Sequence, residues 1–171
     1  MPSSQRWNMR IKLNSLTIII LLFGFFLPSV SMACSCTYGG KFSEYSSKSK
    51  GVIRAKIKSY GPRLPHGETL YESMVVEVIE VIKGKYKNHK LTLLGDPGFL
   101  CRDYVNAKRF GIESEHLFSL ANEKTTQPLG GCGESSVVIK GNIIEGNELI
   151  EDVYKPYTMS VADFIELLKV Q

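Results

Sequence analysis

The sequence predicts a mainly β domain, a small antiparallel barrel or sandwich with a C-terminal helix. Three observations lead to this prediction: short segments rich in Val and Ile, Gly and Pro residues between them, and a helical pattern at the end of the chain. Strands and helices do not alternate along the sequence, which argues against a parallel α/β sheet.

The clearest strand is residues 52–58. Ile53, Ala55 and Ile57 alternate there with three cations, the pattern of a strand with one buried and one exposed face. After it, residues 60–71 contain two Gly and two Pro and predict a long loop or a loose hairpin.

Residues 74–82 form a second Val- and Ile-rich segment. Glu77 and Glu80 are three positions apart and break strict alternation, so we expect a bulge in this strand. Gly95-Asp96-Pro97-Gly98 is a strong turn signal. Residues 102–114 are polar and mixed and predict no regular element. Further strands are expected at residues 90–94, 116–121, 135–140 and 142–150.

The chain ends in an expected helix. Ser160 can cap its N-terminus, and Asp163 completes a capping-box pattern. Apolar residues then recur at helical spacing: Val161, Phe164, Ile165 and Leu168.

Residues 1–33 have the three parts of an export signal. A basic start is followed by the uncharged apolar run 16–27, and Ser31 and Ala33 form a small-x-small cleavage pattern before Cys34. The apolar run is shorter than the roughly 20 residues of a membrane-spanning helix. We therefore expect cleavage between Ala33 and Cys34 and a secreted or periplasmic product. A lipid anchor on Cys34 is the less favoured alternative, because Ser31 stands where lipidation prefers an aliphatic residue.

Cleavage would leave residues 34–171 as one domain. Three of the 21 Lys and Arg residues and none of the 17 acidic residues lie in the signal, so the mature chain has 18 basic and 17 acidic residues, a net charge of +1. Such a nearly neutral chain argues against nucleic acid as a partner. No further segment is long enough to span a membrane, and we expect a monomer.

All four cysteines lie in the predicted mature chain, at positions 34, 36, 101 and 132. An even number in a small exported domain predicts disulfides. Cys34 and Cys36 are too close to bond to each other without strain. Cys34–Cys101 with Cys36–Cys132 and the reverse pairing both remain open from the residues alone. Either pairing would fix the first three mature residues to two distant places in the chain.

The sequence gives little support for a metal site, a redox site or an enzyme active site. A zinc site would need a second close pair of ligands, and a thiol redox enzyme would more often carry Cys-x-x-Cys. No G-x-S-x-G, Walker loop or H-E-x-x-H is present. Glu113, Glu115 and His116 are interpreted as solvated surface, and Gly130 to Gly133 as a turn that admits a disulfide. We therefore expect neither an enzyme nor a bound cofactor.

The cysteine pattern resembles the N-terminal inhibitory domain of the tissue inhibitors of metalloproteinases, a netrin-like family. The match consists of Cys34-Ser35-Cys36 after a signal cut and single cysteines 67 and 98 residues after Cys34. This resemblance implies an OB-like barrel and the pairs Cys34–Cys101 and Cys36–Cys132. It departs from the animal members by lacking a third disulfide and the C-terminal domain, and it has Gly39 and Gly40 where a Pro is typical.

The resemblance also implies a mechanism. The α-amine and carbonyl oxygen of Cys34 would bind the catalytic zinc of a metalloprotease, and the side chain of Ser35 would enter the protease's main specificity pocket. The alternative is a non-inhibitory netrin-like binding module of the cell envelope or extracellular space. That module would use the barrel surface or the loop 60–71, with Tyr60, Tyr71 and Tyr86 as candidate contacts. Core packing is the favoured interpretation of those three tyrosines.

Overall fold

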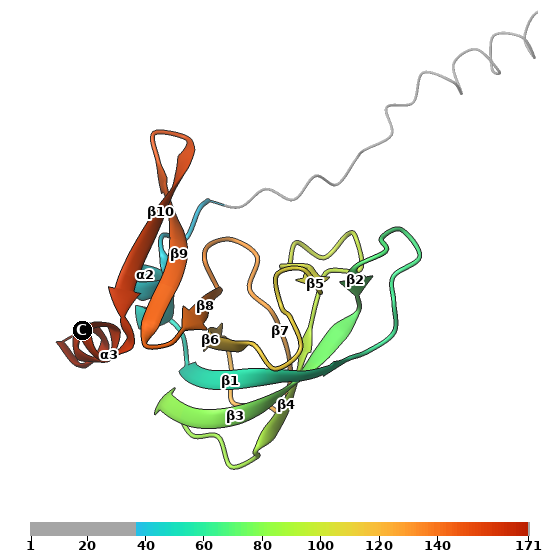
Figure 1. Ribbon diagram of the computed structural model, residues 1–171, viewed down its shortest axis with the longest axis horizontal. Helices are drawn as coiled ribbons and strands as arrows, with labels where there is room; N and C mark the ends of the chain where they lie inside the picture. The colour runs from blue at the N-terminus through green and yellow to red at the C-terminus, as the bar shows by residue number, and fades with distance from the viewer. Residues whose placement is uncertain (1–36, 171) are drawn as a thin grey trace, which may run out of the picture. The chain divides into compact units, whose positions relative to one another are not determined.

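The computed structural model describes residues 37–170 and shows a mainly β architecture (Figure 1). Its helices are α2 (Phe42–Ser47) and α3 (Val161–Val170). Its strands are β1 (Gly51–Tyr60), β2 (Leu70–Tyr71), β3 (Ser73–Lys83), β4 (Lys90–Leu94), β5 (Val105–Asn106), β6 (Glu115–Leu120), β7 (Thr126–Pro128), β8 (Ser136–Lys140), β9 (Ile143–Ile150) and β10 (Val153–Ser160). The predicted mainly β class and the C-terminal helix are confirmed.

Eight strands form one sheet in the order β10-β9-β8-β6-β1-β3-β4-β7, and β2 pairs with β5 in a small second sheet. Neighbouring strands run antiparallel except for β4 and β7, which are parallel. The expectation of an all-antiparallel arrangement was therefore wrong at this pair. The strand order begins at β10 and ends at β7, and no pairing among the described strands closes the sheet into a barrel.

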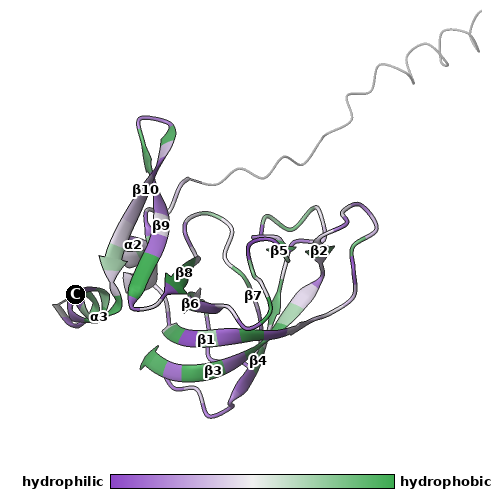
Figure 2. Ribbon diagram, in the orientation of Figure 1, coloured by the Kyte–Doolittle hydropathy of each residue, from purple (hydrophilic) through white to green (hydrophobic). Residues whose placement is uncertain are grey.

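Strand β1 lies at the centre of the sheet and has the predicted alternation (Figure 2). Ile53, Ala55 and Ile57 are fully buried. The cations between them lie on the other face, where Arg54 donates to the Glu115 carboxylate at 2.9 Å. One face of β1 therefore builds the core, and the other forms ion pairs with neighbouring strands.

The predicted bulge in β3 is present. Arg54 lies opposite Glu80 and Ala55 lies opposite Val78, so Ile79 has no partner on β1. This extra residue restores the alternation on both sides of it and leaves Ile79 partly exposed.

Two apolar clusters stabilise the fold. The larger one lies between β1, β3, β4 and β6 and contains Phe110 and Phe118. The smaller one joins both helices to the sheet through Phe42 of α2 and Phe164 of α3, whose ring centroids are 5.1 Å apart. The predicted cap of α3 is confirmed, because the Asp163 amide donates to Ser160 Oγ at 3.0 Å.

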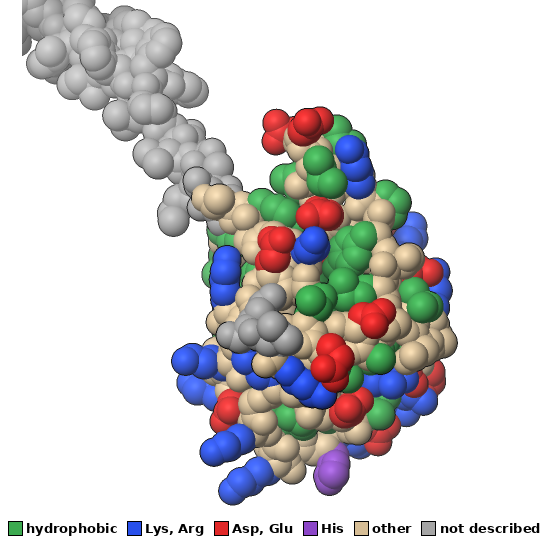
Figure 3. Space-filling view, turned by 90° about the vertical axis from the view of Figure 1, so that its left-hand side faces the viewer, with side chains coloured by type: hydrophobic (Ala, Val, Ile, Leu, Met, Phe, Trp, Pro, Cys, Tyr) green, Lys and Arg blue, Asp and Glu red, His purple; other side chains and the backbone are tan. Residues whose placement is uncertain are grey.

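Four elements were not expected from the sequence: α2, β5, β7 and β10. Strand β10 pairs with β9 in a hairpin that extends beyond the rest of the sheet in Figure 1. Figure 3 shows apolar and acidic side chains together at its projecting end. Glu151 and Asp152 form the turn, both with positive φ angles (50° and 62°).

Candidate functional site

The predicted inhibitory residues Cys34, Ser35 and Cys36 lie outside the described residues. Their two proposed partners are described: Cys101 lies in the segment between β4 and β5, and Cys132 lies in the loop between β7 and β8. Neither of these two is a free cysteine. The pairs Cys34–Cys101 and Cys36–Cys132 remain predictions.

The first described residues lie against the Cys132 loop. The Gly39 amide donates to the carbonyl oxygen of Cys132 at 2.5 Å. A Cβ on Gly39 would lie 2.7 Å from that oxygen and 2.9 Å from the Tyr45 ring. Gly40 has a φ of +94°, a conformation that favours glycine. Gly39 therefore allows a close contact with the Cys132 loop, and Gly40 allows a turn beside it.

The Cys101 segment contacts the same loop. The Asp103 amide donates to the Gly130 carbonyl at 3.2 Å, and a Cβ on Gly131 would clash with the carbonyl oxygen of Cys101. Three segments distant in sequence thus meet at one place. We call residues 37–39, 101–103 and 130–132 the cysteine corner.

A partly buried network of side chains supports the cysteine corner. Ser135 Oγ donates to the Asp103 carboxylate at 3.0 Å and also contacts the Gly130 carbonyl oxygen at 3.1 Å. The Arg109 guanidinium lies 3.4 Å from the Asp103 carboxylate. Burial raises the pKa of Asp103, and the Arg109 charge and the Ser135 hydrogen bond oppose this effect without overcoming it. Asp103 therefore connects the Cys101 segment to the core of the domain.

The loop before Cys101 is organised by one carboxylate. Asp96 is buried and accepts hydrogen bonds from four backbone amides, those of Gly98, Phe99, Leu100 and Arg102, at 2.6–3.0 Å. Burial alone would raise the pKa of Asp96, but the four amide donors outweigh it and lower the pKa. The predicted turn at residues 95–98 is thus held by an ionised side chain.

This loop presents two apolar side chains beside Cys101. Phe99 is 75% exposed and Leu100 is 42% exposed. Cys101 itself has a positive φ of 54°, uncommon for a residue with a side chain. Because Asp96 fixes the backbone, the exposed pair Phe99 and Leu100 is held in place at the edge of the cysteine corner. Sequence reasoning did not identify this pair as a contact surface.

The other residues singled out from the sequence lie elsewhere. Tyr60 and Tyr71 stack at 4.4 Å, and both, like Tyr86, pack against the larger core cluster. Their interpretation as packing residues is confirmed. Glu115 is half-buried and pairs with Arg54. His116 is 1% exposed, so its interpretation as solvated surface was wrong. The strand period places it on the core face, opposite Ala55.

No family model and no curated protein matches this chain. Within residues 37–170, no His, Cys, Asp and Glu side chains form a group that could hold a metal ion. In the same part of the chain, neither helix has the length and apolar character needed to cross a bilayer.

Proposed function

We propose that the exported chain begins at Cys34 and inhibits zinc metalloendopeptidases. The α-amine and carbonyl oxygen of Cys34 chelate the protease's catalytic zinc and displace its water, since such a zinc keeps one position open. The observation that carries this proposal is the cysteine corner. There the described chain starts against Cys132, and the Cys101 segment touches the same loop.

Chain geometry supports the disulfide pairing. Cys36 precedes Gly39 by three residues in the sequence, and three residues of extended chain span at most roughly 11 Å, at about 3.5 Å per residue, from the Gly39 contact with Cys132. A disulfide needs Cα atoms within about 7 Å of each other, which this reach allows. Cys101 borders the same loop, and in this proposal Cys34 bonds to it. A terminus fixed at two points loses little entropy on binding, which favours tight inhibition.

The strand order supports the OB-like barrel that the resemblance implies. Strand β1 pairs with both β3 and β6, and β7 lies beside β4 rather than beside its sequence neighbour β6. Such a non-sequential neighbour is typical of Greek-key barrels, of which the OB-fold is a five-stranded, partly open example.

The partner surface consists of the new terminus and the Phe99 loop. Ser35 enters the main specificity pocket, and Phe99 and Leu100 pack on the rim of the protease cleft. Exposed apolar side chains held by a rigid backbone are suited to such contacts, because little ordering is required on binding.

The test compares the chain that starts at Cys34 with one that carries an additional Ala before it. We expect the natural form to inhibit members of a panel of zinc endopeptidases. The extended form should be weaker by roughly 100-fold or more, because it loses a metal contact worth several kcal/mol. An Ala added after Gln171 is the matched control and should leave inhibition unchanged. Equal inhibition by the natural and N-terminally extended forms would rule out chelation.

A non-inhibitory binding module is the second candidate, and the β9–β10 hairpin favours it. Val153 and Tyr154 are 57% and 64% exposed at its projecting end, and Tyr38 contacts Tyr154 edge-to-face at 6.3 Å. If this candidate is correct, Tyr154→Ala weakens binding to a protein captured by the natural chain, and the additional N-terminal Ala does not.

A further inference from the structure

Exposed lysines gather at the end of the sheet where the chain turns from β3 into β4. They lie on three segments that are separate in sequence, and we call them the lysine patch: Lys50, Lys85, Lys87, Lys90 and Lys124. In Figure 1 the loop from β3 to β4 lies at the opposite end of the molecule from the tip of the β9–β10 hairpin. Figure 3 shows Lys and Arg side chains projecting from this lower end.

Hydrogen bonds hold the β3–β4 loop against the turn that follows β6. The Lys85 amide donates to the Glu123 carboxylate at 2.8 Å. Asn88 Nδ2 donates to Thr125 Oγ1 at 2.7 Å. Lys124 lies between these two contact residues of the turn, so its backbone is held beside the loop.

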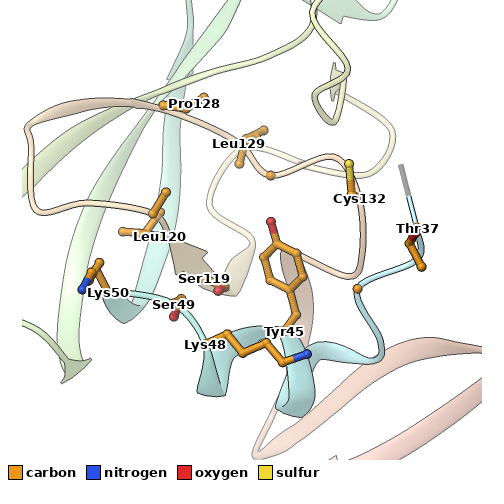
Figure 4. Close-up of a pocket in the computed structure, with 13 residues that line it drawn as sticks. Thr37, Tyr45, Lys48, Ser49, Lys50, Ser119, Leu120, Pro128, Leu129 and Cys132 are labelled. Atoms are coloured by element: carbon orange, nitrogen blue, oxygen red, sulfur yellow. The ribbon is translucent and has the colours of Figure 1, made fainter. Parts of the chain in front are cut away.

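Lys50, just before β1, belongs to the same end of the sheet. A Cβ on Gly84 would lie 2.9 Å from the Lys50 carbonyl oxygen, so the β3–β4 loop touches the backbone there. Figure 4 shows Lys48 and Lys50 on opposite sides of a pocket beside α2, and only Lys50 therefore belongs to the patch. Lys83 is half-buried and donates to the Ser47 carbonyl at 2.7 Å, so its ammonium group is already bound.

The charge of the lysine patch is poorly balanced by its surroundings. None of its ammonium groups forms an ion pair with a residue that the structure describes. Glu123 is the only acidic residue in the segments 84–90 and 122–125. The acidic residues of β3, Glu77 and Glu80, lie opposite cations of β1.

The charges of the predicted mature chain are therefore separated in space. The lysine patch and Glu123 together have a charge of +4. The other 13 basic and 16 acidic residues of the chain from Cys34 onward sum to −3. A chain that is nearly neutral as a whole thus has one basic end, which attracts and orients an anionic partner.

Two aliphatic side chains lie on the strand that leads into the patch. Ile79 and Val81 of β3 are 47% and 38% exposed. Strand β4 pairs with β3 only as far as Glu77, so no β4 residue pairs with this part of β3. The interface of an anionic bilayer accepts cations and aliphatic groups together. A soluble polyanion would leave Ile79 and Val81 in water, so the bilayer is the better fit.

We propose that the lysine patch binds the surface of an anionic phospholipid bilayer. The ammonium groups donate to lipid phosphate oxygens, and Ile79 and Val81 lie at the level of the head groups. The protein stays on the surface and does not cross the membrane. This binding is independent of the proposed protease inhibition, which uses the Cys34 terminus, and it would keep the exported protein beside a membrane.

The test is co-sedimentation of the purified exported protein with lipid vesicles at low salt. We expect binding to vesicles that contain phosphatidylglycerol and none to vesicles of pure phosphatidylcholine. Added salt should weaken the binding, because ions screen exposed charges. No binding to phosphatidylglycerol vesicles, or equal binding to both kinds, would overturn the proposal. Binding to dextran sulfate but not to vesicles would assign the patch to a soluble polyanion and would also overturn it.

Variants locate the surface. Lys85→Gln/Lys87→Gln changes exposed side chains only and should weaken vesicle binding at least about tenfold, since each lysine near an anionic surface contributes about fivefold. The matched control, Lys108→Gln/Lys155→Gln, makes the same charge change at exposed lysines outside the patch and should retain most of the binding. Thermal unfolding checks that both variants are folded. Equal losses in the two double variants would show that net charge, and not the patch, causes the binding.

Discussion

At the scale of single residues, His116 shows how burial changes the pKa of a side chain that the sequence suggested was exposed. Its ring lies between Phe110 and Phe118, with centroids 5.1 and 5.7 Å away. Nε2 is 2.9 Å from Ser114 Oγ, and Nδ1 is buried without a partner among the described residues. Burial, with a smaller contribution from the Arg109 charge, lowers the pKa of His116 from 6.5 to about 4.

This shift predicts a pH-dependent stability. Between pH 6.5 and 4 the unfolded chain binds a proton at His116 and the folded chain does not. The free energy of unfolding should therefore be fully retained above pH 6.5 and fall by up to about 3 kcal/mol as the pH decreases to 4. His116→Phe should remove this part of the pH dependence in denaturant titrations. His89→Phe, at an exposed position, is the control and should keep it; a wild-type slope in His116→Phe would contradict the assignment.

At the scale of elements, the loop before Cys101 depends on one side chain. Asp96→Ala leaves four backbone donors without their acceptor, so we expect a loss of about 3 kcal/mol in the free energy of unfolding. Asp96→Asn should lose less stability, because the amide oxygen of Asn can take the place of Oδ1, which accepts three of the four hydrogen bonds. Only the Arg102 amide, which donates to Oδ2 in the wild type, would then face the NH2 group of Asn. Equal stability of the Ala variant and wild type in urea would show that Asp96 does not hold the loop.

The contribution of Asp96 to the free energy of unfolding also depends on pH. Its pKa is lowered in the folded state, so its contribution is present above the unfolded value of about 3.9 and is lost as the pH falls through the folded value. The wild-type stability should therefore decrease more steeply below pH 4 than that of Asp96→Asn. Acid unfolding curves of both proteins measure this difference.

The cap of α3 can be tested with one variant that removes the capping hydrogen bond and a second that restores it. Ser160→Ala removes the acceptor for the Asp163 amide and should cost about 1 kcal/mol. Ser160→Asp keeps an acceptor at the same place and should restore most of the loss. Thermal unfolding followed by circular dichroism measures both. If Ser160→Ala and Ser160→Asp lose equally, the hydrogen bond is not the source of the effect.

At the scale of the whole molecule, the sequence predicted the elements that have one buried face. Strand β1 and helix α3 show clean periodicity because one side of each packs on the core. The bulge in β3 could be inferred because two glutamates would otherwise have faced opposite sides. Each of these patterns lies within one short segment, so it can be recognised from the sequence alone.

The missed elements lack that local pattern. Most of β10 is exposed on both faces and contains Pro156, so it neither alternates nor looks like a strand. Strand β7 has three residues and pairs with β4 in parallel, a contact fixed only by the whole fold. Helix α2 has six residues and no side-chain cap. The cysteine corner could be predicted only as far as the cysteines themselves, because its hydrogen bonds join three distant segments.

At the scale of the whole molecule, we propose that the exported chain presents the Cys34 terminus to the zinc of another protein. A zinc endopeptidase whose zinc is replaced by cobalt reports ligand exchange at the metal through its visible absorption spectrum. Addition of the natural chain should change that spectrum at a one-to-one ratio, and the chain with an N-terminal Ala should not. A protease that is inhibited by the natural chain while its cobalt spectrum stays unchanged would contradict the claim.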